Sequence, residues 1–241
     1  MSDRNLIHRF TDLTPARVRL GRFGSGLPTK AHLKFQLDHA RARDAVSASF
    51  KPDGLAKAIE REVLVLRSRA PDRPTYLRRP DLGRQLHPDD LELLPSGPFD
   101  LAIVVVDGLS ALAVHAHAAS MTRAVIERLP DWTIAPICAV HQGRVAVGDP
   151  IASRLGASLV CVLIGERPGL SAPDSLGAYL TWRPSVGRLD SERNCVSNIR
   201  PPDGLSYEEA SETVARLARA ARSAGLTGVG LKDGVVSLPP A

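Results

Sequence analysis

DLAIVVVDG, residues 100 to 108, is a continuous apolar run of strand length that ends in an aspartate and a glycine. A run without polar alternation is typical of a strand that is buried on both faces, as in a parallel sheet. The next segment, LSALAVHAHAASMTRAVIERL (109 to 129), has the composition of a helix. The two segments together predict a strand followed by a crossover helix in an α/β domain.

The same alternation continues toward the C-terminus. A strand is predicted at TIAPICAV (133 to 140), a helix at DPIASRLG (149 to 156) and a second buried strand at SLVCVLIGE (158 to 166). GAYLTW (177 to 182) is a further strand candidate, and residues 206 to 225 predict an amphipathic helix that stops at a glycine. Strands that alternate with helices imply right-handed crossovers, so we expect a parallel, doubly wound sheet.

The N-terminal part of the chain is different, and the proline- and glycine-rich segment LPSGPFD (94 to 100) separates it from the rest. It is charged, with a helix predicted over residues 28 to 46 and a short strand at EVLVLRS (62 to 68). We therefore expect a smaller, mainly helical region over residues 1 to 95 and an α/β domain over residues 96 to 241.

Composition limits the class of protein. The chain has 241 residues, of which 44% are hydrophobic and 24% charged, enough apolar material for a sizeable core. No apolar run reaches the ~20 residues that span a bilayer, and MSDRNLIHRF (1 to 10) lacks the features of a secretory signal. We therefore expect a cytoplasmic protein that does not enter a membrane.

The net charge of +5 comes mainly from arginines, which are dispersed along the chain. Aromatic residues that could stack on bases do not interleave with them, so we expect no nucleic-acid binding. A basic protein can still bind an anionic ligand, and a phosphate-bearing cofactor stays open at this point.

Cysteines and histidines give no metal or disulfide pattern. Cys138, Cys161 and Cys195 form no CxxC pair, and the first two lie in apolar runs, where cysteine behaves as a small buried hydrophobe. His115 and His117 are two residues apart in a predicted helix and point to different faces. GxSxG, Walker A and HExxH motifs are missing as well, so we predict no metal site and find no catalytic set.

Polar residues follow three of the predicted strands at the point where each strand ends. These tips are residues 107 to 110, residues 141 to 145 and residues 165 to 168. The carboxyl ends of parallel strands meet at one edge of the sheet, where ligands of open α/β sheets bind. The three tips therefore predict a ligand crevice, and their position nominates Asp107, Ser110 and Arg167 as ligand contacts.

Simpler explanations exist for two of these tips. Asp107 and Gly108 form a turn in the first alternative, and Ser110 caps the helix that follows. In the second alternative, Glu166 and Arg167 are an exposed ion pair of under ~1 kcal/mol.

Longer segments carry a family resemblance. GRVAVGDPIASRLGA (143 to 157), LVCVLIGERPGLSAPDSLGAYL (159 to 180) and DSERNCVSNIRP (190 to 201) belong to a set of segments that runs from about residue 13 to 202. On these segments, which stand in family order, the chain resembles the small subunit of adenosylcobalamin-dependent ethanolamine ammonia-lyase.

The resemblance implies that two kinds of subunit have different roles. The large subunit of that family, a (β/α)8 barrel, holds the substrate and the radical chemistry, and the small subunit closes over the cobalamin with a Rossmann-like domain. The implied assembly is a hetero-oligomer that converts ethanolamine, or a related vicinal amino alcohol, into acetaldehyde or another oxo compound and ammonia. Residues 1 to 95 would dock on the large subunit, which would also carry the catalytic residues.

Matching the family's cobalamin contacts to this sequence places them at Val145 in GRVAVGD, Glu166 in IGERPGL and Cys195 in RNCVSNI. Glu166 would accept hydrogen bonds, whereas Val145 and Cys195 would contact the cofactor by packing or through the backbone. Cobalamin proteins that replace the benzimidazole ligand with histidine carry a DxHxxG motif, and this chain has none. The resemblance therefore implies base-on adenosylcobalamin.

Location and function each retain an alternative. Enteric relatives have a longer polar N-terminal extension linked to a bacterial microcompartment, but only about a dozen residues precede LTPARV here, so free cytoplasm is expected. The alternative function is a stand-alone α/β small-molecule-binding or regulatory module without catalysis. An unrelated nucleotide-dependent enzyme is disfavoured because phosphate loops are missing.

Overall fold

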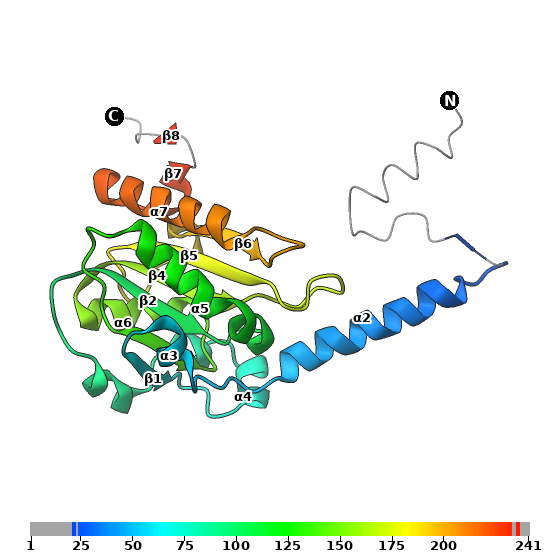
Figure 1. Ribbon diagram of the computed structural model, residues 1–241. Helices are drawn as coiled ribbons and strands as arrows, with labels where there is room; N and C mark the ends of the chain where they lie inside the picture. The colour runs from blue at the N-terminus through cyan, green and yellow to red at the C-terminus, as the bar shows by residue number, and fades with distance from the viewer. Residues whose placement is uncertain (1–20, 23, 233–234, 237–241) are drawn as a thin grey trace.

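A six-stranded sheet forms the centre of the molecule, with helices on both of its faces (Figure 1). The computed structural model describes residues 21–22, 24–232 and 235–236. Parts of both predicted regions, residues 1–20, 23, 233–234 and 237–241, lie outside the described residues. The strand order in the sheet is β1-β3-β2-β4-β5-β6.

The strands are β1 (Val63–Arg67), β2 (Phe99–Val106), β3 (Ile137–His141), β4 (Ala157–Gly165), β5 (Leu176–Trp182) and β6 (Asn194–Ile199), with a small antiparallel pair, β7 (Leu231–Lys232) and β8 (Val235–Val236). The helices are α2 (Thr29–Ser47), α3 (Leu55–Ile59), α4 (Arg73–Arg78), α5 (Ala111–Arg128), α6 (Gly148–Leu155) and α7 (Tyr207–Ala224). Short 3-10 turns are η1 (Leu82–Arg84), η2 (Pro88–Leu93), η3 (Val145–Val147), η4 (Asp190–Glu192) and η5 (Gly228–Gly230).

The α/β class is confirmed, but the prediction of a wholly parallel sheet is wrong. The four strands β1, β3, β2 and β4 are parallel to one another, whereas β5 is antiparallel to β4 and β6 is antiparallel to β5. A parallel neighbour requires a crossover, usually a helix, and residues 166–175 form only a loop between β4 and β5. The predicted strand at 177–182 therefore exists, but it runs in the opposite direction.

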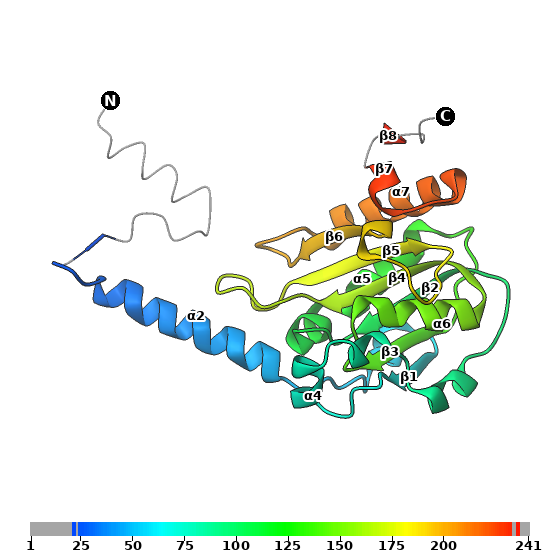
Figure 2. The ribbon, with the colours of Figure 1, turned by 180° about the vertical axis from the view of Figure 1, so that it is seen from behind.

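The apolar run of β2 is buried on both sides, as predicted. Ile103 and Val105 belong to the core cluster that includes α5 and α7, while Val104 and Val106 belong to the cluster that includes α6. Figure 2 shows α6 in front of the sheet when the molecule is seen from behind. Helices therefore cover both faces of the parallel strands.

Helix ends follow their sequence signals. The side chain of Ser110 accepts a hydrogen bond from the Ala113 N–H at the start of α5. Ser206 and Glu209 form a capping box at the start of α7, which ends at Gly225 in the left-handed conformation.

Cys138 and Cys161 are buried, and burial raises the pKa of each thiol to about 12, which confirms their interpretation as buried hydrophobes.

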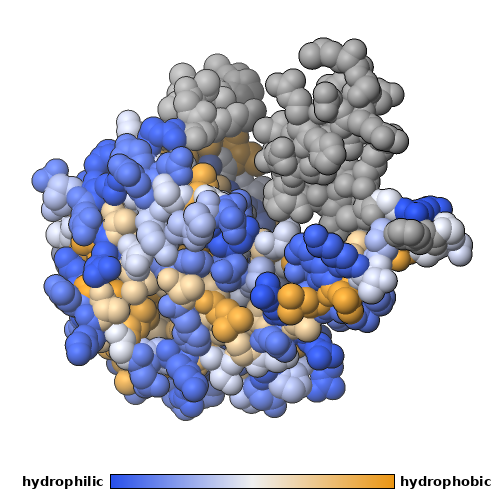
Figure 3. All heavy atoms as spheres, turned by 45° about the vertical axis from the view of Figure 1, so that its right-hand side comes forward, coloured by the Kyte–Doolittle hydropathy of each residue, from blue (hydrophilic) through white to orange (hydrophobic). Residues whose placement is uncertain are grey.

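Residues before the predicted boundary at 95/96 contribute to the same sheet, because β1 pairs with β3. By contrast, α2 extends away from the sheet (Figures 1 and 2) and exposes Leu33 and Leu37 by 58% and 51%. Figure 3 shows apolar patches on the side of the molecule that carries this helix. Within the described ranges, no helix is long and apolar enough to cross a membrane.

Candidate functional site

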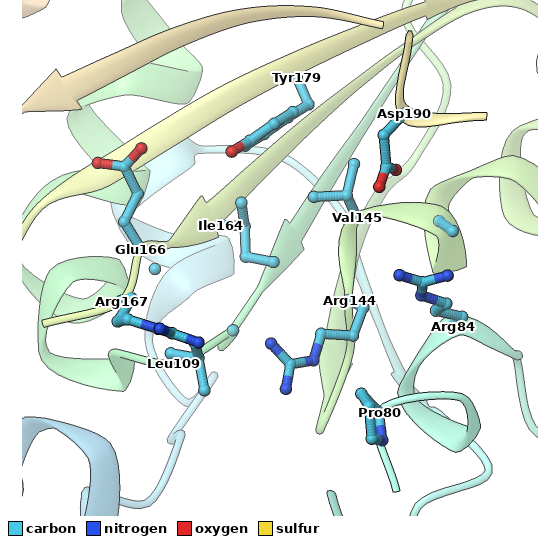
Figure 4. Close-up of a pocket in the computed structure, with 13 residues that line it drawn as sticks. Pro80, Arg84, Leu109, Arg144, Val145, Ile164, Glu166, Arg167, Tyr179 and Asp190 are labelled. Carbon is cyan, nitrogen blue, oxygen red and sulfur yellow. The ribbon is translucent and has the colours of Figure 1, made fainter. Parts of the chain in front are cut away.

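A pocket of about 650 Å³ lies at the carboxyl ends of the parallel strands (Figure 4). β2 and β3 are neighbours in the sheet, and their C-terminal connections lead to α5 on one face and to α6 on the other. Such a reversal opens a crevice between the strand ends, which is where open α/β sheets bind ligands. The pocket therefore occupies the place that the strand tips predicted.

Two glycines bring the ends of β2 and β4 into close contact. Leu109 N donates to the carbonyl oxygen of Gly165 at 2.9 Å. A Cβ atom on Gly165 would lie 2.0 Å from the carbonyl oxygen of Ser110, and one on Gly108 would lie 2.2 Å from that of Gly165. No side chain fits at either position, which explains why the apolar strand ends in glycine.

Glu166, the next residue, is held by donors from the antiparallel part of the sheet. Its carboxylate accepts hydrogen bonds from Ser175 Oγ and Ser197 Oγ, both at 2.5 Å, and from Asn198 N at 3.2 Å. In Figure 4 this side chain lies at the pocket rim and extends from the end of β4 toward β5. The alternative of an exposed ion pair with Arg167 is wrong, because the carboxylate is bound by these three donors.

Asp107 and Ser110 are buried beneath the lining of the pocket and hold the strand tips in place. Asp107 is buried and accepts hydrogen bonds from Gln142 N at 2.9 Å and Gly143 N at 3.0 Å. Burial raises the pKa of Asp107 to about 6, although these bonds and the nearby Arg73 lower it. Ser110, also buried, caps α5 and donates to the carbonyl oxygen of Pro173 at 2.8 Å.

The cap interpretation is confirmed for Ser110. The turn itself comprises Gly108 and Leu109, directly after Asp107, whose carboxylate instead binds the tip of β3. The pocket surface nearby comes from Gly108 and Leu109, and neither Asp107 nor Ser110 lines it. Their predicted contact with a ligand stays a prediction.

The other predicted residues divide into two groups. Val145, Glu166 and Arg167 line the pocket together. Cys195 is exposed on β6 and does not line the pocket, but it pairs with Tyr179, which does. The pKa of the Cys195 thiol is raised, because its desolvation outweighs a hydrogen bond with Tyr179.

Sequence reasoning did not nominate several pocket residues, among them Arg84, Arg144 and Tyr179. Arg144 lies within one of the three polar strand tips, so its position was a usable signal. Tyr179 comes to the pocket because β5 returns antiparallel beside β4, and Arg84 comes from η1, before the predicted boundary. The short connection before β5 was a usable signal for Tyr179, whereas nothing in the sequence alone marked Arg84.

The fold and pocket define an α/β protein with a pocket at the carboxyl edge of its parallel strands. A family model described as ethanolamine ammonia-lyase light chain (EutC) matches residues 4–232. The chain belongs to this family, which confirms the resemblance seen in the sequence.

Similar proteins include the ethanolamine ammonia-lyase small subunits of three bacteria. The Azotobacter vinelandii protein is 52% identical over 97% of this chain and 92% of its own length. The Xanthomonas campestris pv. campestris protein is 51% identical over 93% and 86%, and that of Pseudomonas putida 53% over 92% and 85%. Such coverage extends the likeness over both the sheet and the residues that precede it.

Proposed function

We propose that this chain acts as the small subunit of an ethanolamine ammonia-lyase and forms a hetero-oligomer with a large (β/α)8-barrel subunit. With that subunit it binds base-on adenosylcobalamin and supports the deamination of ethanolamine or a related amino alcohol. Family membership supports the role, and the observation that carries the cofactor assignment is the pocket that brings Val145 and Glu166 together.

The surface of the pocket fits a cobalamin. Leu109, Val145, Ile164 and Tyr179 provide apolar surface for the macrocycle or its benzimidazole, and polar side chains surround them. The buried Nε of Arg144 has no hydrogen-bond partner among the described residues, so an acceptor supplied by a ligand would satisfy it. When bound, adenosylcobalamin supplies the radical that abstracts hydrogen from the amino alcohol.

The residues of this chain would bind and position the cofactor, while the catalytic residues would lie on the large subunit. The carboxylate of Glu166 is already fixed by three donors, so the one acceptor position left, on Oε1, is oriented before a ligand arrives. Val145 and Tyr179 would exclude water from the macrocycle. We thus propose that residues 96–241 form most of a Rossmann-like cobalamin-binding domain, to which β1 adds a strand and η1 adds Arg84.

The N-terminal part is proposed to dock on the large subunit in the cytoplasm. Its helix α2 extends from the sheet and presents Leu33 and Leu37, which are exposed in this chain by itself. Apolar side chains gathered on a projecting helix are typical of a surface that packs against a partner.

Glu166→Ala tests the cofactor site in the complex co-expressed with the cognate large subunit. We expect about tenfold or more weaker adenosylcobalamin binding, because a charged hydrogen-bond acceptor is removed. Equilibrium dialysis gives the affinity, and the visible spectrum gives the axial-ligand state. Glu166→Gln, which keeps an acceptor, should lose less, and Glu127→Ala, an exposed change on α5, should lose nothing.

Two results would contradict the proposal. Unchanged affinity in a folded Glu166→Ala complex would remove Glu166 from the site. Ammonia release by the isolated chain, or failure of the two chains to associate, would overturn the subunit role. The stand-alone module predicts ligand binding without any large subunit, so the isolated chain separates the two functions.

A further inference from the structure

Three arginines from separate segments line the pocket. Arg84 ends η1, Arg144 follows β3 and Arg167 follows β4. Figure 4 shows their side chains along one rim of the pocket, with Glu166, Tyr179 and Asp190 along the opposite rim. Within the described residues, none of the three guanidinium groups forms an ion pair or a hydrogen bond with the protein.

Arg144 is the most firmly positioned of the three. Its Cζ lies 4.4 Å from the ring centroid of the buried Tyr76, and its backbone N–H donates to the carbonyl oxygen of Gly83 at 2.7 Å. Tyr76 is itself fixed, because its hydroxyl donates to the carbonyl oxygen of Gly143 at 3.0 Å. A guanidinium held by stacking, with a buried and unpartnered Nε, lacks a hydrogen-bond acceptor.

The acidic residues of the opposite rim do not form ion pairs with these arginines. The Glu166 carboxylate is taken by Ser175, Ser197 and Asn198. The Asp190 side chain is 81% exposed, and its ion pair is with Arg193, at 3.7 Å. The arginine rim therefore gathers three cations whose charges are not paired, an arrangement that favours a negatively charged ligand.

We propose that Arg84, Arg144 and Arg167 form a subsite for a phosphate diester. Guanidinium groups match phosphate because each offers planar paired donors and stays protonated at all physiological pH values. The inference rests on the function proposed above, in which the occupant is the phosphate of the cofactor's nucleotide tail. That phosphate is the negatively charged group of adenosylcobalamin. The same chemistry would also accept free inorganic phosphate, so the test separates the two.

The test compares two corrinoids on the assembled complex with the large subunit. Adenosylcobalamin carries the nucleotide tail, and cobinamide is the corrinoid without nucleotide and phosphate. We expect Arg144→Gln to weaken adenosylcobalamin binding about ten- to a hundredfold and to change cobinamide binding by less than about twofold. Arg154→Gln, an exposed change on α6 with the same loss of charge, should affect neither.

Further variants keep the test decisive if Arg144→Gln fails to fold. Arg84→Gln and Arg167→Gln remove exposed side chains that hold no other part of the protein, so the fold should persist. Each should weaken adenosylcobalamin binding severalfold and leave cobinamide binding unchanged, because each removes a charge from the same phosphate. An equal loss for both corrinoids, or no loss for either, would overturn the subsite.

Inorganic phosphate is the last probe. Calorimetry measures whether phosphate binding depends on Arg144. If it does, and Arg144→Gln changes the affinities for the two corrinoids equally, the site belongs to free phosphate and the cofactor occupant is overturned. If the wild-type complex binds neither corrinoid, the proposed function fails, and the cofactor occupant fails with it. Discrimination between the two corrinoids by the wild type, lost in Arg144→Gln, supports the subsite.

Discussion

The parallel and antiparallel halves of the sheet build the pocket in different ways. At the ends of the parallel strands β2 and β4, Gly108 and Gly165 allow backbone to pack directly on backbone. The antiparallel half, β5 and β6, instead sends side chains such as Ser197 toward Glu166. The parallel half therefore sets the shape of the pocket, and the antiparallel half positions a functional group at its rim.

A buried ion pair joins the two halves. Arg193, just before β6, donates to both oxygens of Asp149 on α6 at 2.8 and 2.7 Å and to Thr181 Oγ1 on β5 at 2.7 Å. Both charged side chains are almost fully buried. Because burying two charges is expensive, such a pair is better explained by fixing one arrangement of the two halves than by added stability.

Gly165→Ala should destabilise the protein most, because it forces apart the ends of the parallel strands β2 and β4. The new Cβ would lie 2.0 Å from the Ser110 carbonyl oxygen and 2.7 Å from that of Asp107. Neither backbone atom can rotate away, so we expect a loss on the order of 5 kcal/mol or more in the free energy of unfolding. Soluble yield and urea-induced unfolding of the full chain measure it.

Gly169→Ala is the matched control for that variant. It lies in the loop that leads to β5, where the nearest atom to a new Cβ would be 3.8 Å away. We expect normal yield and an unfolding midpoint close to that of the wild type. Equal behaviour of the two variants would show that the strand ends do not depend on backbone contact.

Arg193→Met would remove the ion pair that joins the two halves of the sheet. It leaves the Asp149 carboxylate buried without its partner, so we expect a loss of about 3–5 kcal/mol in the free energy of unfolding. Replacing both residues, by Arg193→Met with Asp149→Leu, should recover much of this loss. The exposed Arg154→Met on α6 is the control. A loss below about 1 kcal/mol would place the pair among ordinary surface ion pairs.

The difference between the halves also explains what sequence could predict. The buried run of β2 needs neighbours on both faces, so the α/β class followed directly from Ile103 to Val106 and the helix after them. The direction of β5 did not follow, because its residues suit a buried strand of either orientation. It depends on residues 166–175, a connection too short for a crossover to a parallel strand, and that length was a usable signal in the sequence.

The site, like the fold, could be predicted in part from the sequence. Val145, Glu166 and Arg167 follow the ends of parallel strands, so order along the chain placed them at one edge. Tyr179 depends on the direction of β5, which only the length of the preceding loop indicates. Arg84 depends on the packing of η1, which local sequence does not encode. Asp107 has the right position for a ligand contact, but its oxygens are taken by the backbone of the neighbouring tip.

Asp107 should make the free energy of unfolding depend weakly on pH. Its pKa is raised by burial to about 6 in the folded chain, so the folded state holds this proton more tightly than the unfolded state. The contribution of Asp107 to stability is therefore complete below the usual aspartate range and is lost as pH rises from about 4 to about 6. A difference of one between the folded and unfolded pKa values corresponds to about 1.4 kcal/mol, which limits the change to a few kcal/mol.

The measurement compares wild type with Asp107→Asn, a variant that cannot titrate at this position. Other carboxyl groups titrate alike in both chains, so the difference between their free energies of unfolding isolates Asp107. We expect the wild-type advantage to decrease between pH 4 and 6 and to be constant above that. An advantage that grows with pH would mean that Gln142 N, Gly143 N and Arg73 stabilise the carboxylate by more than burial destabilises it. The tips of β2 and β3 would then be held together by charge as well as by geometry.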